Sequence, residues 1–179
     1  MQIGIISDTH NYLMGINEAL DFFLENQIYT IFHCGDWTKP ETVKHFAVEA
    51  HKRGQKVYGV FGNNDREYID EITKLNSVLF NPVNFPKNSE YLLFKHKKIR
   101  MCIYHGDSKQ TIEKILNEEN LDVLFLGHSH IPKKEFYKQT QILNPGSIAY
   151  SIPFRKRDLE IRTVGIYDTQ KRNFTLYEI

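Results

Sequence analysis

The sequence has few cysteines and no long apolar run. Cys34 and Cys102 are the only cysteines among 179 residues, and because they form no CxxC pair, a disulfide scaffold is not expected. No stretch approaches the roughly 20 apolar residues of a membrane-spanning helix, and the first residues lack the basic segment that opens a signal peptide. We therefore expect a cytoplasmic protein that does not enter the membrane.

An excess of charge of one sign is also missing. The formal net charge is +1 at pH 7, so the chain has no polybasic signature, and extended binding of nucleic acids is not expected. Hydrophobic residues make up 41% and charged residues 25%, which is typical of a globular protein with a sizeable core. The length favours a single domain over residues 1–179, and no repeat or linker divides the chain.

The first third of the chain alternates between short apolar runs and segments with helical spacing. The expected strands are Ile3–Ser7, Tyr29–Cys34 and Lys56–Phe61, and the expected helices are Gly15–Gln27 and the segment from Pro40 to Gly54. Proline suits the first turn of a helix and glycine suits its end, which fits the second helix. This β-α-β-α-β order predicts a parallel α/β sheet.

The rest of the chain predicts a mixture of helices and antiparallel strands. Arg66–Leu75 is expected to be a short helix, and Asn81–Asn88 is expected to be irregular because it contains two prolines. The later expected elements are a hairpin of Tyr91–Phe94 and Ile99–Tyr104, a helix capped by Ser108 that runs to about Asn120, a buried strand at Val123–Leu126, and antiparallel strands at Glu135–Ile142, Ile161–Asp168 and Phe174–Ile179. The basic segment Ser151–Arg162 is the best candidate for a mobile loop.

Five short polar motifs follow the apolar runs. They are Asp8-Thr9-His10, Gly35-Asp36, Gly62-Asn63-Asn64-Asp65, His105-Gly106-Asp107 and Gly127-His128-Ser129-His130. Ligands of α/β sheets bind outside the carboxyl ends of the strands, so we expect these motifs to meet at one edge. Two Asp, one Asn and four His among them are oxygen and nitrogen donors that divalent cations prefer. Seven donors exceed the needs of one tetrahedral cation, which favours two cations that share a carboxylate.

In their order along the chain, the motifs DxH, GD, GNxD, His-Gly and GHxH resemble those of the calcineurin-like metallophosphoesterase superfamily. The short length and the later Asn144-Pro145-Gly146-Ser147 are similar to its small single-domain phosphodiesterases of bacteria and archaea. The resemblance implies an α/β fold, a four-layer α-β-β-α sandwich of two mixed sheets flanked by helices. It also implies a divalent-metal-dependent phosphodiesterase, in which a hydroxide that bridges the metals attacks the phosphorus of a small phosphoester substrate.

The resemblance assigns a role to each donor. One cation would be held by Asp8, His10, Asp36 and His130, and the second by Asp36, Asn63, His105 and His128. Asp36 would then bridge two divalent metal ions, with Mn preferred and Ni, Fe, Zn, Co and Mg as alternatives. The residues expected to act in catalysis are Asp36, Asn64, Asp65 and His105.

Two positions depart from the family pattern. Asn64 stands where family members often carry His, or Cys in the small group, and an amide cannot deliver a proton at neutral pH. We therefore expect weak catalysis toward poor leaving groups. Asp107 stands where His is common, and we do not expect it to be a metal ligand. It is instead a candidate for orienting His105.

Several alternatives stay open. Within the enzyme class the alternative is a phosphomonoesterase, and outside it a non-catalytic scaffold similar to the small retromer subunit, although every matching ligand position is intact. A phosphate-binding flap around Pro153 and Arg155 is the alternative to a solvated loop. His33 is expected to be a hydrogen-bonded core residue, and the surface histidines are expected to be His45, His51 and His96. The oligomeric state is open, with a dimer as one alternative.

Overall fold

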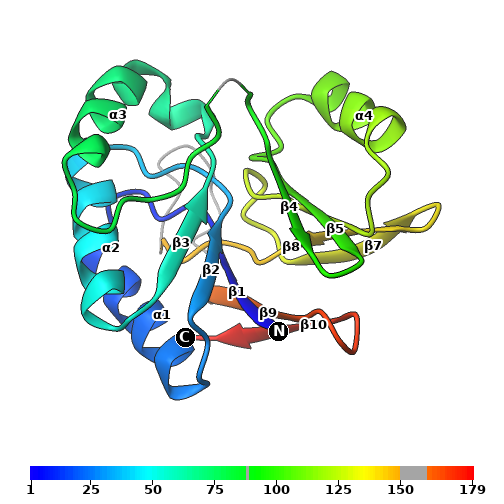
Figure 1. Cartoon of the computed structure of the whole chain (residues 1–179), viewed down its shortest axis with the longest axis horizontal. Helices are drawn as coiled ribbons and strands as arrows, with labels where there is room; N and C mark the ends of the chain where they lie inside the picture. Colours follow the sequence, from blue (N-terminus) through cyan, green and yellow to red (C-terminus); the bar gives the residue numbers. More distant parts are fainter. Residues whose placement is uncertain (88, 150–160) are drawn as a thin grey trace.

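The computed structural model describes residues 1–87, 89–149 and 161–179, which form two five-stranded sheets with helices on their outer faces (Figure 1). This arrangement confirms the predicted four-layer sandwich. The predicted mobile loop Ser151–Arg162 lies outside the described residues except for Ile161 and Arg162, as do Pro153 and Arg155 of the alternative flap. Within the described ranges, no helix is long and apolar enough to cross a membrane.

The first sheet contains the predicted β-α-β-α-β unit. Its strands are β1 (Gln2–Ile6), β2 (Thr30–His33), β3 (Lys56–Gly59), β9 (Thr163–Asp168) and β10 (Asn173–Glu178), in the spatial order β10-β9-β1-β2-β3. Strands β1, β2 and β3 run parallel, β9 pairs with β1 in antiparallel orientation, and β10 pairs with β9 in antiparallel orientation. The carboxyl ends of three parallel strands therefore lie at the same edge of the sheet.

The second sheet differs from the prediction at one strand. Its strands are β4 (Leu92–His96), β5 (Ile99–Ile103), β6 (Val123–Phe125), β7 (Lys133–Tyr137) and β8 (Thr140–Asn144), in the order β4-β5-β6-β8-β7. The predicted β4–β5 hairpin is confirmed. Glu135–Ile142, predicted as one strand, is instead a hairpin of β7 and β8 that turns at Lys138, whose φ is 53°. Because β8 also pairs with β6 in parallel, the purely antiparallel prediction was wrong.

The helices cover the two outer faces. Helices α1 (Leu13–Glu25), α2 (Pro40–Lys52) and α3 (Ile69–Ser77) lie on the side of the first sheet, and α4 (Lys109–Glu118) lies on the side of the second (Figure 1). The predicted helix Arg66–Leu75 consists of a 3-10 helix, η1 (Asn63–Tyr68), followed by α3. Ser108 caps α4 as predicted, because its hydroxyl accepts a hydrogen bond from Thr111 N at 3.2 Å.

Apolar side chains fill the space between the layers. Ile5 of β1, Phe32 of β2 and Phe125 of β6 are fully buried in one cluster that joins the two sheets. Ile6, the next residue of β1, belongs to the cluster beneath α1 and α2. Strand β1 is therefore buried on both faces, which accounts for its continuous apolar sequence. The first charged side chain after it, Asp8, marks the edge at which the polar motifs gather.

Candidate metal centre

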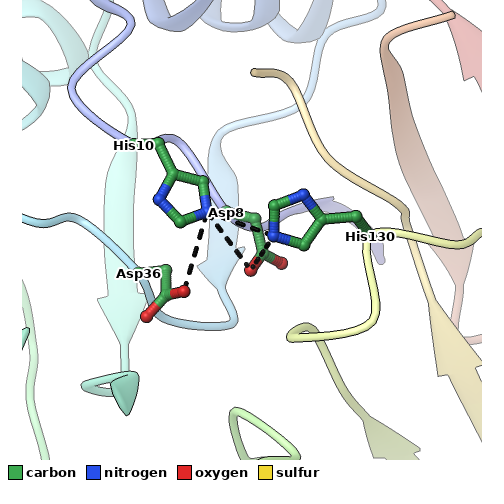
Figure 2. A group of neighbouring side chains, drawn as sticks. All are labelled: Asp8, His10, Asp36 and His130. Carbon is green, nitrogen blue, oxygen red and sulfur yellow. Dashed lines mark hydrogen bonds and ion pairs between the residues drawn. The ribbon is translucent and has the colours of Figure 1, made fainter. Parts of the chain in front are cut away.

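Four residues from three separate motifs direct ligand atoms toward one point (Figure 2). These atoms of Asp8, His10, Asp36 and His130 all lie within 4.8 Å of one another. His10 Nε2 lies 3.6 Å from Asp36 Oδ2, and His130 Nε2 lies 3.1 Å from Asp8 Oδ1. The structure thus brings together the residues predicted to hold the first cation.

The charge state of this group fits a divalent cation. Burial lowers the pKa of His10, so its imidazole is neutral at neutral pH. Burial raises the pKa of Asp8, but its contact with His130 and the electrostatic influence of His105 outweigh that effect, and the pKa lies below its ordinary value. Asp8 Oδ1 is buried and, among the described residues, accepts no hydrogen bond of good geometry, although His130 Nε2 lies 3.1 Å away. A cation would satisfy this oxygen, and metals bind neutral imidazoles and ionised carboxylates.

A second set of donors lies beside the first. Asn63 Oδ1 lies 3.0 Å from His105 Nε2 and 3.0 Å from His128 Nδ1. His105 Nδ1 lies 2.8 Å from the carbonyl oxygen of Cys34 and donates to it, which leaves the Nε2 lone pair facing Asn63. Burial lowers the pKa of His128, so its imidazole is also suited to binding a metal. These are the remaining residues predicted to hold the second cation.

Asp36 lies between the two sets. Its Oδ2 atom faces His10 Nε2 at 3.6 Å, and its Oδ1 atom faces His105 Nε2 at 3.4 Å. One carboxylate thus presents one oxygen to each set. The structure therefore places all seven predicted ligands in one group, which we call the donor cluster: Asp8, His10, Asp36, Asn63, His105, His128 and His130.

Most of the donor cluster has a strained backbone. The φ angle is 54° at Asp8, 41° at His10, 63° at Asp36, 64° at His128 and 58° at His130. Residues other than glycine rarely adopt this left-handed backbone conformation, which costs on the order of 1–3 kcal/mol for each residue. Backbone hydrogen bonds hold two motifs in place, from Asp8 N to Gly35 O at 3.0 Å and from His10 N to Asp36 O at 3.1 Å. Clustered strain of this kind is typical of functional sites.

Two glycines allow the backbone to pass close to the carboxylates. A Cβ on Gly62 would lie 2.2 Å from Asp36 Oδ1. A Cβ on Gly127 would lie 2.0 Å from Ser7 Oγ and 2.8 Å from Asp8 Oδ2. Any larger residue at either position would displace a predicted ligand, so the sequence requires glycine at both.

Asp65 supports the turn that carries Asp36. Its buried carboxylate accepts hydrogen bonds from Thr38 N at 2.7 Å, Gly62 N at 2.7 Å and Asp36 N at 3.1 Å. Burial raises the pKa of Asp65 to about 6. All of these partners are backbone amides, so the contacts give Asp65 a positioning role, and its predicted part in catalysis stays a prediction. Asn64, its neighbour, contacts Asp36 through its side-chain amide.

The contacts of Asp107 differ from its predicted role of orienting His105. Tyr104 OH donates to Asp107 Oδ1 at 2.8 Å, and Arg66 Nη2 contacts Asp107 Oδ2 at 2.6 Å. His105 is oriented instead by its hydrogen bond to the Cys34 carbonyl. Asp107 lies outside the donor cluster, and the expectation that it is not a ligand stays a prediction.

His33 is the buried, hydrogen-bonded core residue that the sequence predicts. Its Nδ1 atom accepts a hydrogen bond from Gly35 N at 3.1 Å, and its Nε2 atom lies 3.3 Å from Thr9 Oγ1. Thr9 Oγ1 in turn donates to Asp36 O at 3.2 Å. His33 therefore links the loops that carry Asp8 and Asp36. Among the other histidines, His51 is exposed, while His45 and His96 are half-buried.

Two supporting residues were missed in the sequence, although they stand in the quoted Asn-Pro-Gly-Ser motif. Ser147 Oγ donates to Asp8 O at 2.9 Å, and Asn144 Nδ2 donates to Gly127 O at 2.6 Å. Both side chains are buried and fix the backbone next to predicted ligands. The motif itself was the signal that could have identified them.

Known proteins resemble this chain in sequence. The family model for the calcineurin-like phosphoesterase superfamily domain matches residues 1–172. Among curated proteins, phosphodiesterase MJ0936 of Methanocaldococcus jannaschii is 26% identical over 180 residues, which cover 97% of this chain and 96% of that protein. The relative and this chain are therefore alike over nearly their full lengths.

Solved structures extend the likeness to the fold. A novel archaeal phosphodiesterase has a TM-score of 0.78 at 25% identity, with 100% of both chains covered. A single-mutant form of Vps29 from Entamoeba histolytica has a TM-score of 0.65 at 18% identity, over 99% of this chain and 91% of that one, a likeness that shows the fold alone. Because the family model spans almost every residue, the chain belongs to the calcineurin-like phosphoesterase superfamily.

Proposed function

We propose that the protein is a divalent-metal-dependent phosphodiesterase. The observation that carries this proposal is the pair of donor sets that share Asp36. Membership of a phosphoesterase superfamily supports phosphoester hydrolysis, and the relative named phosphodiesterase supports a diester as the substrate. A small phosphoester is the substrate class that we propose.

Two cations would occupy the donor cluster, one in each set. When bound, they supply Lewis-acid chemistry that lowers the pKa of water and neutralises charge on phosphoryl oxygens. The oxygen and nitrogen donors suit Mn, our preferred cation, as well as Ni, Fe, Zn, Co or Mg. The neutral imidazole of His10 and the ionised carboxylate of Asp8 favour retention of such cations at neutral pH.

The chain's own groups would orient the cluster and the ester. The Cys34 carbonyl fixes the tautomer of His105, and Asp65 fixes the turn of Asp36. The exposed Asn64 amide adjoins Asp36 and can donate a hydrogen bond to a phosphoryl oxygen. Because an amide does not release a proton at neutral pH, Asn64 would bind the ester without protonating the leaving group. Aryl esters should therefore be better substrates than alkyl esters.

Hydrolysis assays with metal-stripped protein test the proposal. Each cation is added back separately, and turnover of bis-p-nitrophenyl phosphate, a diester, is compared with that of p-nitrophenyl phosphate, a monoester. We expect metal-dependent turnover that favours the diester. A preference for the monoester would identify a phosphomonoesterase. Cation binding without turnover of either ester would support the scaffold alternative.

A matched pair of variants tests the geometry. Asp36→Asn removes the shared carboxylate and should lower kcat by at least about a thousandfold. Asp21→Asn makes the same chemical change at an exposed ion pair with Arg53 on the helical face, and it should keep full activity. Full activity in Asp36→Asn would reject the shared-ligand role.

Location and assembly complete the proposal. We propose a cytoplasmic protein, supported by two cysteines that are both free and buried, because cytoplasmic thiols are kept reduced. We propose a protein that binds neither membranes nor long nucleic acids, in line with its net charge of +1. A dimer is the assembly to be tested by light scattering.

A further inference from the structure

A cavity of about 610 Å³ adjoins the donor cluster. Its lining includes Gly62, from the loop after β3, and Tyr104 and Asp107, which flank His105-Gly106 after β5. A Cβ on Gly62 would lie 2.2 Å from Asp36 Oδ1, so this part of the wall is next to the shared carboxylate. The lining contains none of the seven donors, so the cavity is a separate space beside them.

Two stacked phenylalanines form the apolar part of this cavity. The rings of Phe61 and Phe85 have centroids 4.3 Å apart and planes inclined by 10°. Both side chains are half-buried, and Phe85 also packs edge-on against Trp37 at 5.7 Å, which fixes its plane. Ile69 and Val83 add aliphatic surface to the same lining. Because aromatic rings stack favourably on one another, the exposed surface of this rigid ring pair favours binding of another flat ring in the cavity.

The amide side chains of this wall are already engaged. Asn76 Oδ1 accepts from Val83 N, and Asn76 Nδ2 donates to Val83 O, both at 2.9 Å. Asn84 Nδ2 donates to Val57 O at 2.7 Å. These contacts hold the backbone at 83–84 against α3 and β3. The part of the wall formed by Phe61 and Phe85 therefore selects ligands mainly by shape and apolar contact.

Another part of the lining contains an ion pair that neutralises its own charge. Arg66 Nη2 contacts Asp107 Oδ2 at 2.6 Å, and Tyr104 OH donates to the other oxygen at 2.8 Å. Because Arg66 balances the carboxylate of Asp107, this wall would not repel an anionic phosphoester whose ring enters the cavity. Arg66 lies in η1 after β3 and Asp107 follows β5, so their ion pair joins segments of the two sheets in the lining of the cavity.

From these walls we propose that the cavity binds a flat aromatic ring on one ester arm of the substrate, while its phosphoryl group lies at the donor cluster. The proposal rests on the proposed phosphodiesterase function for the identity of the ester. A simple aryl group and a nucleobase share the required chemistry. Stacking on Phe61 and Phe85 should make an aromatic ligand bind about tenfold more tightly than a non-aromatic counterpart.

Paired ligands test the cavity without requiring turnover. Calorimetric titrations with Mn²⁺ present compare phenylphosphonate with cyclohexylphosphonate, and adenosine monophosphate with ribose 5-phosphate. We expect the aromatic member to bind about tenfold more tightly in at least one pair. A preference in the first pair alone identifies an aryl site, and one in the nucleotide pair identifies a nucleobase site. Equal affinities within both pairs would overturn the proposal.

Substitutions on two separate segments locate the effect. Phe61→Leu and Phe85→Leu should each bring the affinity ratio within a pair close to one. Phe80→Leu removes a ring that is 91% exposed and lies outside the cavity, so it should keep the wild-type ratio. An unchanged ratio in both cavity variants, with native circular dichroism spectra, would contradict the assignment.

The failures of the two proposals can be distinguished. Aromatic preference in calorimetry, without hydrolysis of any phosphodiester, would retain the ring site and reject the enzymatic function. Metal-dependent hydrolysis with equal affinities for aromatic and saturated ligands would retain the enzymatic function and reject the ring site.

Discussion

Asn64 contacts both carboxylate oxygens of Asp36, through its side-chain Nδ2 at 2.6 Å from Oδ2 and its backbone N at 3.0 Å from Oδ1. Each carboxylate oxygen has two lone pairs, so a hydrogen bond leaves one free for a cation. Asn64 thereby determines which lone pairs of the shared carboxylate face the donor cluster. The amide of the same residue cannot transfer a proton to a poor leaving group at neutral pH.

Replacing Asn64 by histidine should improve hydrolysis of alkyl diesters. An imidazole can both donate a hydrogen bond and release a proton near neutral pH, which an amide cannot. We expect kcat/KM for an alkyl leaving group to rise about tenfold relative to that for p-nitrophenolate. The measurement is the ratio of the two rates in Asn64→His and wild type, with Asn64→Gln as the non-acidic control. An unchanged ratio would reject the role of the missing proton.

Removing the His33 side chain should weaken cation binding without removing a ligand. His33→Ala deletes the contacts with Gly35 N and Thr9 Oγ1, so the loops of Asp8 and Asp36 lose their link. We expect the Kd for Mn²⁺ to rise about tenfold, as for other residues that support ligands. His33→Asn keeps an acceptor for Gly35 N and should recover part of the affinity. His45→Ala, a substitution on α2, should bind the cation as wild type does.

Gly127→Ala should disturb the first donor set selectively. The added Cβ would meet Ser7 Oγ and Asp8 Oδ2, so Asp8 must move or the loop must open. We expect weaker binding of one cation and a loss of about 1–3 kcal/mol in the free energy of unfolding, measured in urea. Gly54→Ala is the control for the close approach, because its Cβ would meet no atom within 4 Å; its φ of 67°, unlike the φ of Gly127, adds backbone strain alone. Equal cation affinity in Gly127→Ala would show that the close approach is unimportant.

Neither cysteine should react with a thiol reagent in the folded protein. Burial raises the pKa of Cys34 well above its ordinary value and also raises that of Cys102, so the reactive thiolate is scarce at mildly alkaline pH. Titration with a disulfide reagent should find no accessible thiol in native protein and two in guanidinium chloride. Ser77→Cys, at an exposed position, should add one fast-reacting thiol. Rapid labelling of native wild type would indicate that the core opens.

The sequence predicted the donors because each motif directly follows a buried strand. Asp8 follows β1 and Asp36 follows β2, and these strands are parallel neighbours, so their ends had to meet. The turn between β7 and β8 escaped prediction because Tyr137-Lys138-Gln139-Thr140 contains none of the usual turn residues. A period-two pattern alone cannot show where such a strand reverses.

The partners of the supporting residues were not predictable from local patterns. Asp107 pairs with Arg66, which lies 41 positions away, in the 3-10 helix η1 that follows a strand of the other sheet. Asp65 belongs to a recognisable motif, yet its contact with Thr38 N depends on how two loops pack. The predicted ligands thus follow from local sequence, whereas the orientation of each of these side chains depends on tertiary contacts.

The single tryptophan of the chain gives the protein an intrinsic optical reporter. Trp37 follows the shared carboxylate of Asp36, and its indole stacks on His33 with ring centroids 3.5 Å apart. The same indole touches Phe85 of the adjoining cavity. Its fluorescence should therefore respond both to cations at the donor cluster and to rings in the cavity, so one unlabelled emission signal can follow both kinds of binding in a single titration.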